Sequence, residues 1–299
     1  MGNSAVQLLT GNAPAAGVVV PAMIAATFGG FFRNKIINGD FRIAQRNTTF
    51  SSPATATYTL DRWVVTYDGT IGAFTLSRQT FTPGQTDVPD EPIYFMRWNH
   101  TSAGSGSTFR RISQKIESCQ SLAGKNATVT FYAKADIGRN VVGALVQNFG
   151  SGGSAAVSTA LGTFSLTSSW QKFTATVAVP SVSGKTIGAG DNLELRLDLP
   201  INATMTIEIA HVQVEENGGT PFEQRPVGLE QNLCERYYQV LQMFVGATSV
   251  SLPFKSGMMA TPTVGGGGSG FASSSVSVYG GSCSQTTGAN QTITLEAEL

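Results

Sequence analysis

Apolar and polar residues alternate through the middle of the chain, from residue 35 onward. The clearest cases are 125–135, 170–179 and 193–199, where apolar side chains occupy every second position. A period of two buries one face of an antiparallel strand and leaves the other face in water. Each segment is therefore predicted to be a strand. Turn-rich stretches separate further strands, which are expected near 57–67, 72–81, 92–100, 108–118, 141–149 and 157–166.

A long apolar strand is also expected within Thr204–Phe222. Its alternation changes phase, because the apolar residues 205, 207 and 209 share one face whereas residues 212 and 214 lie on the other. A β-bulge near Ala210–His211 reconciles the two halves. The segment Lys35–Arg46, far back in the sequence, is the expected partner that closes one sandwich with this strand.

These strands, with no segment of helical period among them, predict an all-β fold, a jelly-roll β-sandwich over residues 35–226. Before it, prolines and glycines interrupt an apolar stretch, so residues 1–34 are expected to form an extended N-terminal arm. After the sandwich, Gly228–Phe244 carries an apolar stripe at helical spacing. It predicts one α-helix in a connecting segment, 227–246, that ends at Gly246.

Residues 247–299 predict a small C-terminal β unit. Its strands are expected near 248–255, 258–264, 271–279 and 291–298, and Gly265–Gly268 is interpreted as a flexible linker between them. A unit of this size is marginal alone, so we expect it to complete its core against the helix or against neighbouring subunits.

The charge distribution argues against several classes of partner. The 19 basic and 19 acidic residues cancel, which predicts neither nucleic-acid binding nor attraction to an anionic membrane. No charged residue occurs in 1–32 or in 256–295, so these stretches are expected to pack against another copy of the chain or another protein. Prolines within 13–32 argue against a signal peptide and against membrane insertion.

The three cysteines Cys119, Cys234 and Cys283 lack the spacing of a zinc site and are odd in number. Reduced thiols and synthesis in the cytoplasm are the simpler interpretation.

Several segments in a fixed order are similar to those of a known family. They are INGDF (37–41), YTLDRW (58–63), SLAGKNATVTFYAKAD (121–136), SWQKFTATVAVPSVSGKTIG (169–188), LELRLDLP (193–200), IAHVQVEENGGTPFEQRPVGLEQNLCERYYQ (209–239) and FKSGMMATPTV (254–264). Together they resemble the carbohydrate-binding-module-like jelly-roll region of tail fibre and other virion proteins of tailed bacteriophages and prophages. The resemblance implies a jelly roll, a virion location after synthesis in the host cytoplasm, and a homo-oligomer, often a trimer.

Jelly-roll modules of this kind bind glycans by stacking sugar rings on exposed aromatic side chains. Trp170 has the parity of Lys172, opposite the core residues of its strand, and Tyr132 lies beside Lys134 on a polar face. Trp170, Tyr132 and Lys134 are therefore the candidate glycan contacts, and edge or inter-subunit packing is the alternative for Trp170. By the same parity Trp63 is expected in the core, whereas the pattern leaves Trp98 undecided.

Related sandwiches also hold a structural calcium ion between the first and last strands, which makes Asp40 and Glu215 candidate ligands; the alternative is that Asp40 serves its own turn. No other cofactor is expected. Glu194 and Asp198 are interpreted as a solvated face, and adjacent Glu215 and Glu216 point opposite ways.

The sequence shows no acid or nucleophile placed by spacing near His100 or His211, so a catalytic arrangement is unsupported. The leading hypothesis is a non-enzymatic structural protein of a tailed phage, a tail fibre or appendage subunit with host-glycan binding, attached to other virion proteins through 1–34. The alternative is a head fibre or capsid decoration protein. A glycan-degrading enzyme is disfavoured, because no acid/base pair is evident.

Overall fold

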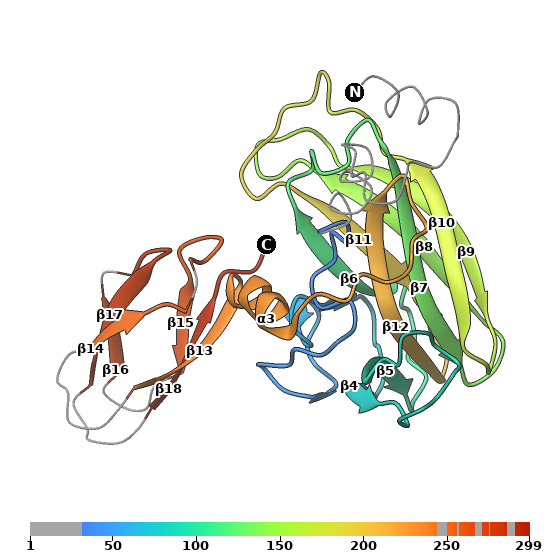
Figure 1. The fold of residues 1–299 in the computed structure, drawn as a ribbon, viewed down its shortest axis with the longest axis horizontal. Helices are drawn as coiled ribbons and strands as arrows, with labels where there is room; N and C mark the ends of the chain where they lie inside the picture. The colour runs from blue at the N-terminus through green and yellow to red at the C-terminus, as the bar shows by residue number, and fades with distance from the viewer. Residues whose placement is uncertain (1–31, 244–249, 256, 267–270, 275, 286–290) are drawn as a thin grey trace, which may run out of the picture.

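The structure is a computed structural model that describes residues 32–243, 250–255, 257–266, 271–274, 276–285 and 291–299. Two six-stranded sheets face each other in its larger part (Figure 1). Sheet A has the order β1 (Thr49–Ser51), β4 (Phe74–Thr80), β5 (Tyr94–His100), β12 (Met205–Glu216), β7 (Asn126–Ala135) and β10 (Gln171–Ala178). Sheet B has the order β2 (Thr57–Tyr58), β3 (Val64–Tyr67), β6 (Arg110–Glu117), β11 (Asn192–Asp198), β8 (Arg139–Asn148) and β9 (Val157–Leu166).

The prediction of an all-β jelly-roll sandwich is confirmed. The strands of both sheets pair antiparallel, and the chain passes repeatedly from one sheet to the other. The alternating apolar residues fill the space between the sheets, as the period of two requires. Trp63 lies in this core as expected, and Trp98, which the pattern left undecided, is also fully buried and stacks on Phe74 with 4.8 Å between ring centroids.

The bulge in β12 is confirmed at the expected place. The register with β7 shifts between Ala210 and Gln213, and His211 adopts a left-handed φ of 48°. The predicted pairing of β12 with a strand in Lys35–Arg46 is wrong. β12 pairs with β5 and β7, and Lys35–Arg46 forms no strand. Left-handed φ values of 58° at both Asn38 and Phe41 coil that segment.

Even so, the coiled segment contacts β12 beyond the bulge. Lys35 donates its backbone N–H to Val214 O at 2.7 Å, and Val212 donates its own to Gly39 O at 2.9 Å. Asn34 joins them, because its buried side chain accepts from Val214 N at 3.0 Å. The jelly roll therefore begins before residue 35, and residue 34 belongs to it rather than to the arm.

The helix is shorter than predicted. It is α3 (Val227–Glu235), and the next residues form strand β13 (Tyr238–Met243) instead of further helical turns. The aromatic and apolar residues there suit a pleated strand as well as a helix, and pairing with β18 (Gln291–Glu296) decides between them. Arg236 and Tyr237 end the helix against β6, since both donate to Glu117 Oε1, at 2.7 and 2.5 Å. Gly246, the expected stop, lies outside the described residues.

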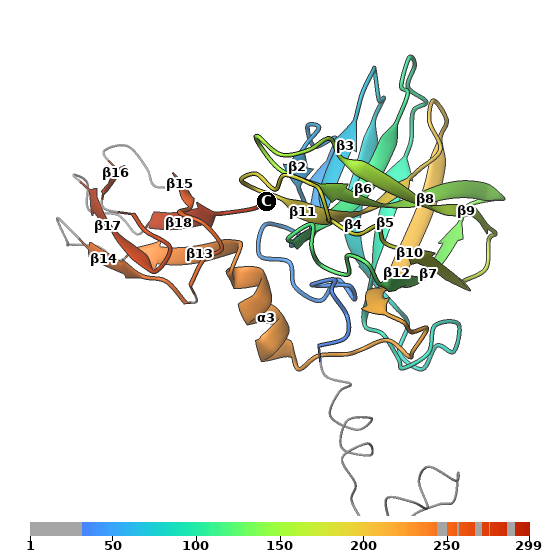
Figure 2. The same cartoon turned by 90° about the horizontal axis from the view of Figure 1, so that it is seen from above.

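The C-terminal β unit contains two three-stranded sheets. One has the order β13, β18, β15 (Thr263–Gly266), and the other β14 (Val250–Pro253), β17 (Gly280–Gln285), β16 (Phe271–Ser274). Gly265 and Gly266 pair with Thr294 and Ile293, so the described half of the expected flexible linker is strand. Figure 2 shows this unit beside the jelly roll, with α3 between them.

Residues 1–31 of the expected arm lie outside the described residues. At residues 32 and 34 the chain is tied to the Glu223 carboxylate, which accepts from Phe32 N at 2.5 Å and from Asn34 N at 2.7 Å. Cys119 and Cys234 are buried free thiols, and the Cys283 side chain lies outside the described ones. Within the described part, no helix has the length and apolar character needed to cross a bilayer.

Candidate ligand-binding site

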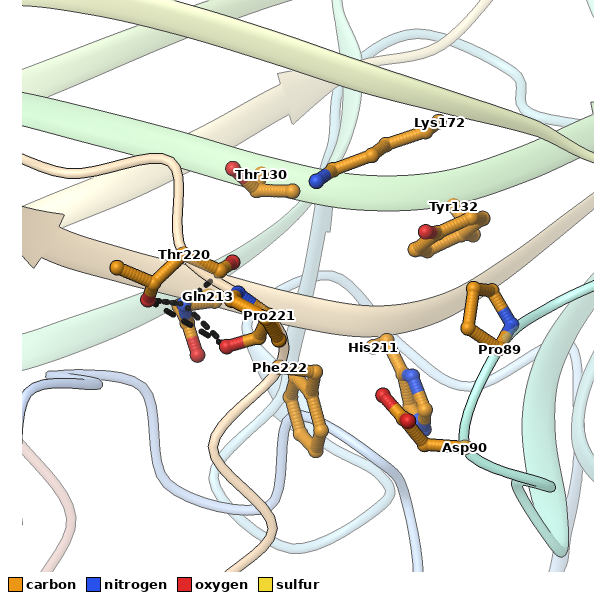
Figure 3. A pocket seen from close by; sticks show the side chains of 10 residues that line it. All are labelled: Pro89, Asp90, Thr130, Tyr132, Lys172, His211, Gln213, Thr220, Pro221 and Phe222. Carbon is orange, nitrogen blue, oxygen red and sulfur yellow. Dashed lines mark hydrogen bonds between the residues drawn. The ribbon is translucent and has the colours of Figure 1, made fainter.

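A cavity of about 280 Å³ lies on the outer face of sheet A, where the bulge of β12 faces β7 and β10 (Figure 3). We call it the sheet A pocket. It draws its lining from four parts of the chain: Pro89, Asp90, Thr130, Tyr132, Lys172, His211, Gln213, Thr220, Pro221 and Phe222.

The bulge creates the floor of the pocket. An extra residue in a strand changes the direction of the side chains beside it. His211 has a left-handed φ, which His adopts more readily than β-branched residues do. The His211 ring stacks on Phe222 with 4.1 Å between centroids and 6° between planes. It also meets the Tyr132 ring edge-on at 6.3 Å, so an imidazole is held between two aromatic side chains.

One wall of the pocket is the loop after β12, which folds back over the sheet. The Glu215 carboxylate accepts from Thr220 N at 2.8 Å and from Thr220 Oγ1 at 2.7 Å. Gln213 Oε1 accepts from Glu223 N at 2.8 Å. These bonds hold Phe222 against His211, so Gln213 and Glu215 position the wall.

Two buried polar atoms of lining residues have no hydrogen-bond partner among the described residues. Thr130 Oγ1 and His211 Nδ1 are both enclosed, and their residues are only 4% and 3% exposed. Burying such a group unpaired costs about 1–3 kcal/mol. A polar ligand would supply the missing partners if the Thr130 hydroxyl and the His211 ring turn toward the pocket, because both atoms are enclosed in the free protein.

Two charged groups in the lining are also free. The side chains of Lys172 and Asp90, both solvent-exposed, make no ion pair or hydrogen bond with another described residue. Figure 3 shows the Lys172 ammonium directed toward Thr130, while the Asp90 carboxylate lies beside His211. The pocket therefore has a cationic end and an anionic end.

His211 is neutral at physiological pH. Burial lowers its pKa to about 4 and outweighs the carboxylates of Asp40 and Asp90, which act in the opposite direction. Burial, together with Asp90, also raises the pKa of Tyr132, so its hydroxyl stays protonated. The lining thus presents an imidazole and three hydroxyls as neutral hydrogen-bonding groups.

The structure brings one of the three expected glycan contacts into the pocket, namely Tyr132. Trp170 does lie on the outer face, but its ring packs on Phe81 and Phe95, with centroids 5.2 and 5.5 Å away. Lys134 is ion-paired to Glu208 at 3.0 Å, next to Trp170. A glycan-binding role for Trp170 and Lys134 stays a prediction, and neither lines the pocket.

Sequence reasoning missed the other lining residues. Asp90, Thr130, Lys172 and Phe222 carry no local signal, because only the folded sheet brings them together. The phase change at His211 was the one sign in the sequence that a side chain there is re-aimed.

The expected calcium ligands have protein partners. Asp40 is ion-paired with Arg42, and Glu215 accepts from Thr220, as described above. Among the described residues, no group of three His, Cys, Asp or Glu is arranged to hold a metal ion. A structural calcium ion at Asp40 and Glu215 stays a prediction.

The outer face of sheet B has a larger cavity, of about 480 Å³, which we call the sheet B cavity. Glu194 lies in it, 6% exposed and paired with Arg196 at 2.7 Å, so the expected solvated face is wrong for this residue. Leu299 covers one side, where its carbonyl accepts from Tyr58 at 2.8 Å and from Lys115. Charged side chains that line this cavity are therefore already partnered.

No family model and no curated protein matches the chain. Among solved structures, the enzymatically active domain of tailspike protein 4 of bacteriophage CBA120 is similar, with a TM-score of 0.41 and 14% identity over 62% of this chain. This chain spans 21% of that tailspike chain. A CBM4 module is similar with a TM-score of 0.37 and 19% identity, over 60% of this chain and 98% of the module.

The module TmCBM61, solved in complex with β-1,4-galactotriose, has a TM-score of 0.37 and 12% identity, over 62% of this chain and 99% of its own. At such identities and TM-scores these are remote likenesses, and no ligand or activity is transferred from them.

Proposed function

We propose that the chain is a structural virion protein of a tailed phage, a tail fibre or appendage subunit, and that the sheet A pocket binds a saccharide of the host surface. The virion role rests on the resemblance of the ordered segments within 37–264. The binding role rests on one observation: Thr130 and His211 line the pocket, and their buried Oγ1 and Nδ1 atoms have no partner among the described residues.

The shape and lining of the pocket suit a sugar. Its volume of about 280 Å³ lies just below that of most pockets for drug-sized ligands, which favours a ligand of one or two rings. Pro89, Pro221 and Phe222 supply apolar surface for the C–H face of a pyranose. The hydroxyls and the imidazole supply donors and acceptors for its hydroxyl groups.

A binding role is favoured over hydrolysis. Glycoside hydrolysis uses two carboxyl groups that flank the scissile bond. The pocket lining has one, Asp90, because the nearby carboxylate of Glu215 is turned onto Thr220. Sugar bound here would meet groups that hold it and no second carboxylate.

A glycan array probed with the full chain tests the binding role. We expect signal for a small set of host envelope sugars, and we expect Thr130→Val, which keeps the shape of the side chain, to reduce it. An array without signal for any envelope glycan would contradict the proposal.

The location is tested separately. Electron microscopy of particles labelled on this protein should show it on the tail; label on the capsid would instead establish the head-fibre or decoration alternative.

We also propose that the protein is a homotrimer attached through its N-terminal segment. The uncharged stretches 1–32 and 256–295 support this. Deletion of residues 1–31 should leave the jelly roll folded and abolish incorporation into particles. The cut stops there because Asn34 is bonded to β12. A monomer mass for the full chain by light scattering would contradict the trimer.

A further inference from the structure

We infer that the saccharide bound in the sheet A pocket is an acidic one, with its carboxylate at the Lys172 end and its hydroxyls at the Asp90 end. This inference rests on the proposed saccharide site and specifies the class of sugar it takes. It follows from the way in which charge is divided across the pocket.

At one end, Lys172 and Thr130 form a site for a carboxylate. They come from neighbouring strands, since Lys172 pairs with Tyr132 and Thr130 with Thr174, which places the two side chains diagonally on one face. The Lys172 ammonium points toward Thr130 and has no partner among the described residues (Figure 3). A carboxylate there would accept from the ammonium and, once the hydroxyl turns toward the pocket, from Thr130 Oγ1, which lacks a partner among the described residues.

At the other end, Asp90 and His211 suit hydroxyl groups. A carboxylate is an acceptor only, and the hydroxyls of a sugar ring are donors that match it. His211 Nδ1 offers one further hydrogen bond to the same part of the ligand. Asp90 also repels anions, so the negative group of the ligand belongs at the Lys172 end.

This division of charge selects among ligands. A phosphate monoester carries close to two negative charges, so Asp90 repels it more strongly than it repels a carboxylate. A neutral sugar gains no charge-assisted hydrogen bond from the Lys172 ammonium, which is solvent-exposed in the free protein. An amino sugar places a cation near Lys172 or leaves the carboxylate-sized site beside Thr130 empty. A uronic acid, with one carboxylate and hydroxyls around the rest of its ring, fits both ends.

Matched sugars test the inference. Titration calorimetry with the full chain would compare methyl glucuronoside with methyl glucoside, and methyl galacturonoside with methyl galactoside, at low salt. We expect the acidic member of the bound pair to bind at least about tenfold more tightly, because a charge-assisted hydrogen bond is gained. This preference should shrink as salt is raised.

Two variants and a control test whether the preference for the acidic sugar arises from Lys172. Lys172→Met should bring the acidic-to-neutral ratio down to about one while affinity for the neutral sugar stays within about twofold. Asp90→Asn should weaken both members of the pair and retain the preference. Lys125→Met removes a lysine that is ion-paired to Glu216 at 2.6 Å outside the lining, and it should change neither affinity. Thermal melts confirm that each variant is folded.

The outcomes separate this inference from the proposed function. Equal binding of acidic and neutral sugars by the unaltered chain, or a preference that survives in Lys172→Met, would overturn the inference and leave the saccharide site standing. If no sugar of either kind binds, on the array or in solution, the proposed site falls and the inference falls with it.

Discussion

The cavities on the outer faces of sheets A and B differ in whether the buried polar side chains of their linings have partners. On sheet B, Glu194 is paired with Arg196, and Lys115 and Tyr58 contact Leu299. On sheet A, Thr130 and His211 line the pocket, and their Oγ1 and Nδ1 atoms have no partner among the described residues. A buried polar group that is paired serves the fold, whereas an unpaired one costs stability and suggests a ligand where its residue lines a cavity.

The difference also has a structural origin. On sheet B, the end of the C-terminal unit covers polar side chains with its own carbonyl and carboxylate groups. On sheet A, the bulged strand and the folded-back loop enclose a space that no described side chain fills. The polar side chains of the sheet B cavity therefore contact the C-terminal unit, whereas those of the sheet A pocket remain open to a ligand.

The largest loss of stability should come from breaking a buried ion pair between the C-terminal unit and the jelly roll. Arg62 is 1% exposed and is ion-paired with Glu298, whose side chain is 4% exposed. Glu298→Ala leaves a buried guanidinium uncompensated, so we expect a loss of about 3 kcal/mol in unfolding free energy by urea denaturation. Glu296→Ala removes a carboxylate that is 48% exposed and should cost under about 1 kcal/mol. Equal losses of unfolding free energy in the two variants would contradict the distinction between buried and exposed ion pairs.

The second effect is the pH dependence of stability that arises from His211 in the sheet A pocket. The pKa of His211 falls from 6.5 to about 4 on folding, so the protein favours the neutral ring. This stabilisation is complete above pH 6.5 and is lost as the pH falls toward 4. It amounts to roughly 3 kcal/mol across that window.

The comparison variant is His211→Asn, since Asn tolerates the left-handed φ. Its unfolding free energy should fall less steeply between pH 6.5 and 4 than that of the unaltered chain. Parallel pH profiles for the two proteins would show that His211 is not the group responsible.

A third prediction separates packing from binding on the sheet A face. Trp170→Ala removes a ring that packs on Phe81 and Phe95 outside the pocket lining. We expect a loss of about 2 kcal/mol in stability from the exposed apolar surface. Saccharide affinity should change by less than about fivefold, because Trp170 does not line the pocket although it packs on the same cluster as Tyr132. A tenfold loss of affinity in a folded variant would restore Trp170 as a sugar contact.

The smallest change in stability should come from removing the Thr130 hydroxyl. Thr130→Val removes a hydroxyl without a partner and should leave the unfolding free energy unchanged or raise it by up to about 1 kcal/mol. Thr128, on the same face of β7, bonds Thr176 at 2.8 Å, so Thr128→Val should cost about 1 kcal/mol. Only the Thr130 variant should bind saccharide more weakly. A similar stability loss in both variants would mean that Thr130 is satisfied in the free protein.

Most of the sandwich could be predicted from the sequence, because the period of two is a local property. The bulge at His211 was visible as a change of phase. The end of α3 was not, because the residues of β13 suit both a helix and a strand, and only pairing with β18 decides. The face of Trp98 was undecided for a similar reason, since Phe95 on the opposite face of β5 is also apolar and packs into the small cluster around Phe81.

The candidate site was predicted only in part. Parity placed Tyr132 on the correct face, and it placed Trp170 there as well. It did not show that Phe81, in the loop after β4, and Phe95, in β5, cover the Trp170 ring. Nor did it show that the loop after β12 returns over its own strand to make a wall. Such contacts join residues that are far apart in the sequence, so the local pattern of apolar and polar positions does not reveal them.

The most direct test is a crystal structure of the full chain soaked with the saccharide selected on the array. The proposed site predicts a sugar ring in the sheet A pocket, within hydrogen-bond distance of Thr130 Oγ1 and His211 Nδ1. A saccharide bound instead in the sheet B cavity, with these two atoms still unpartnered, would contradict it.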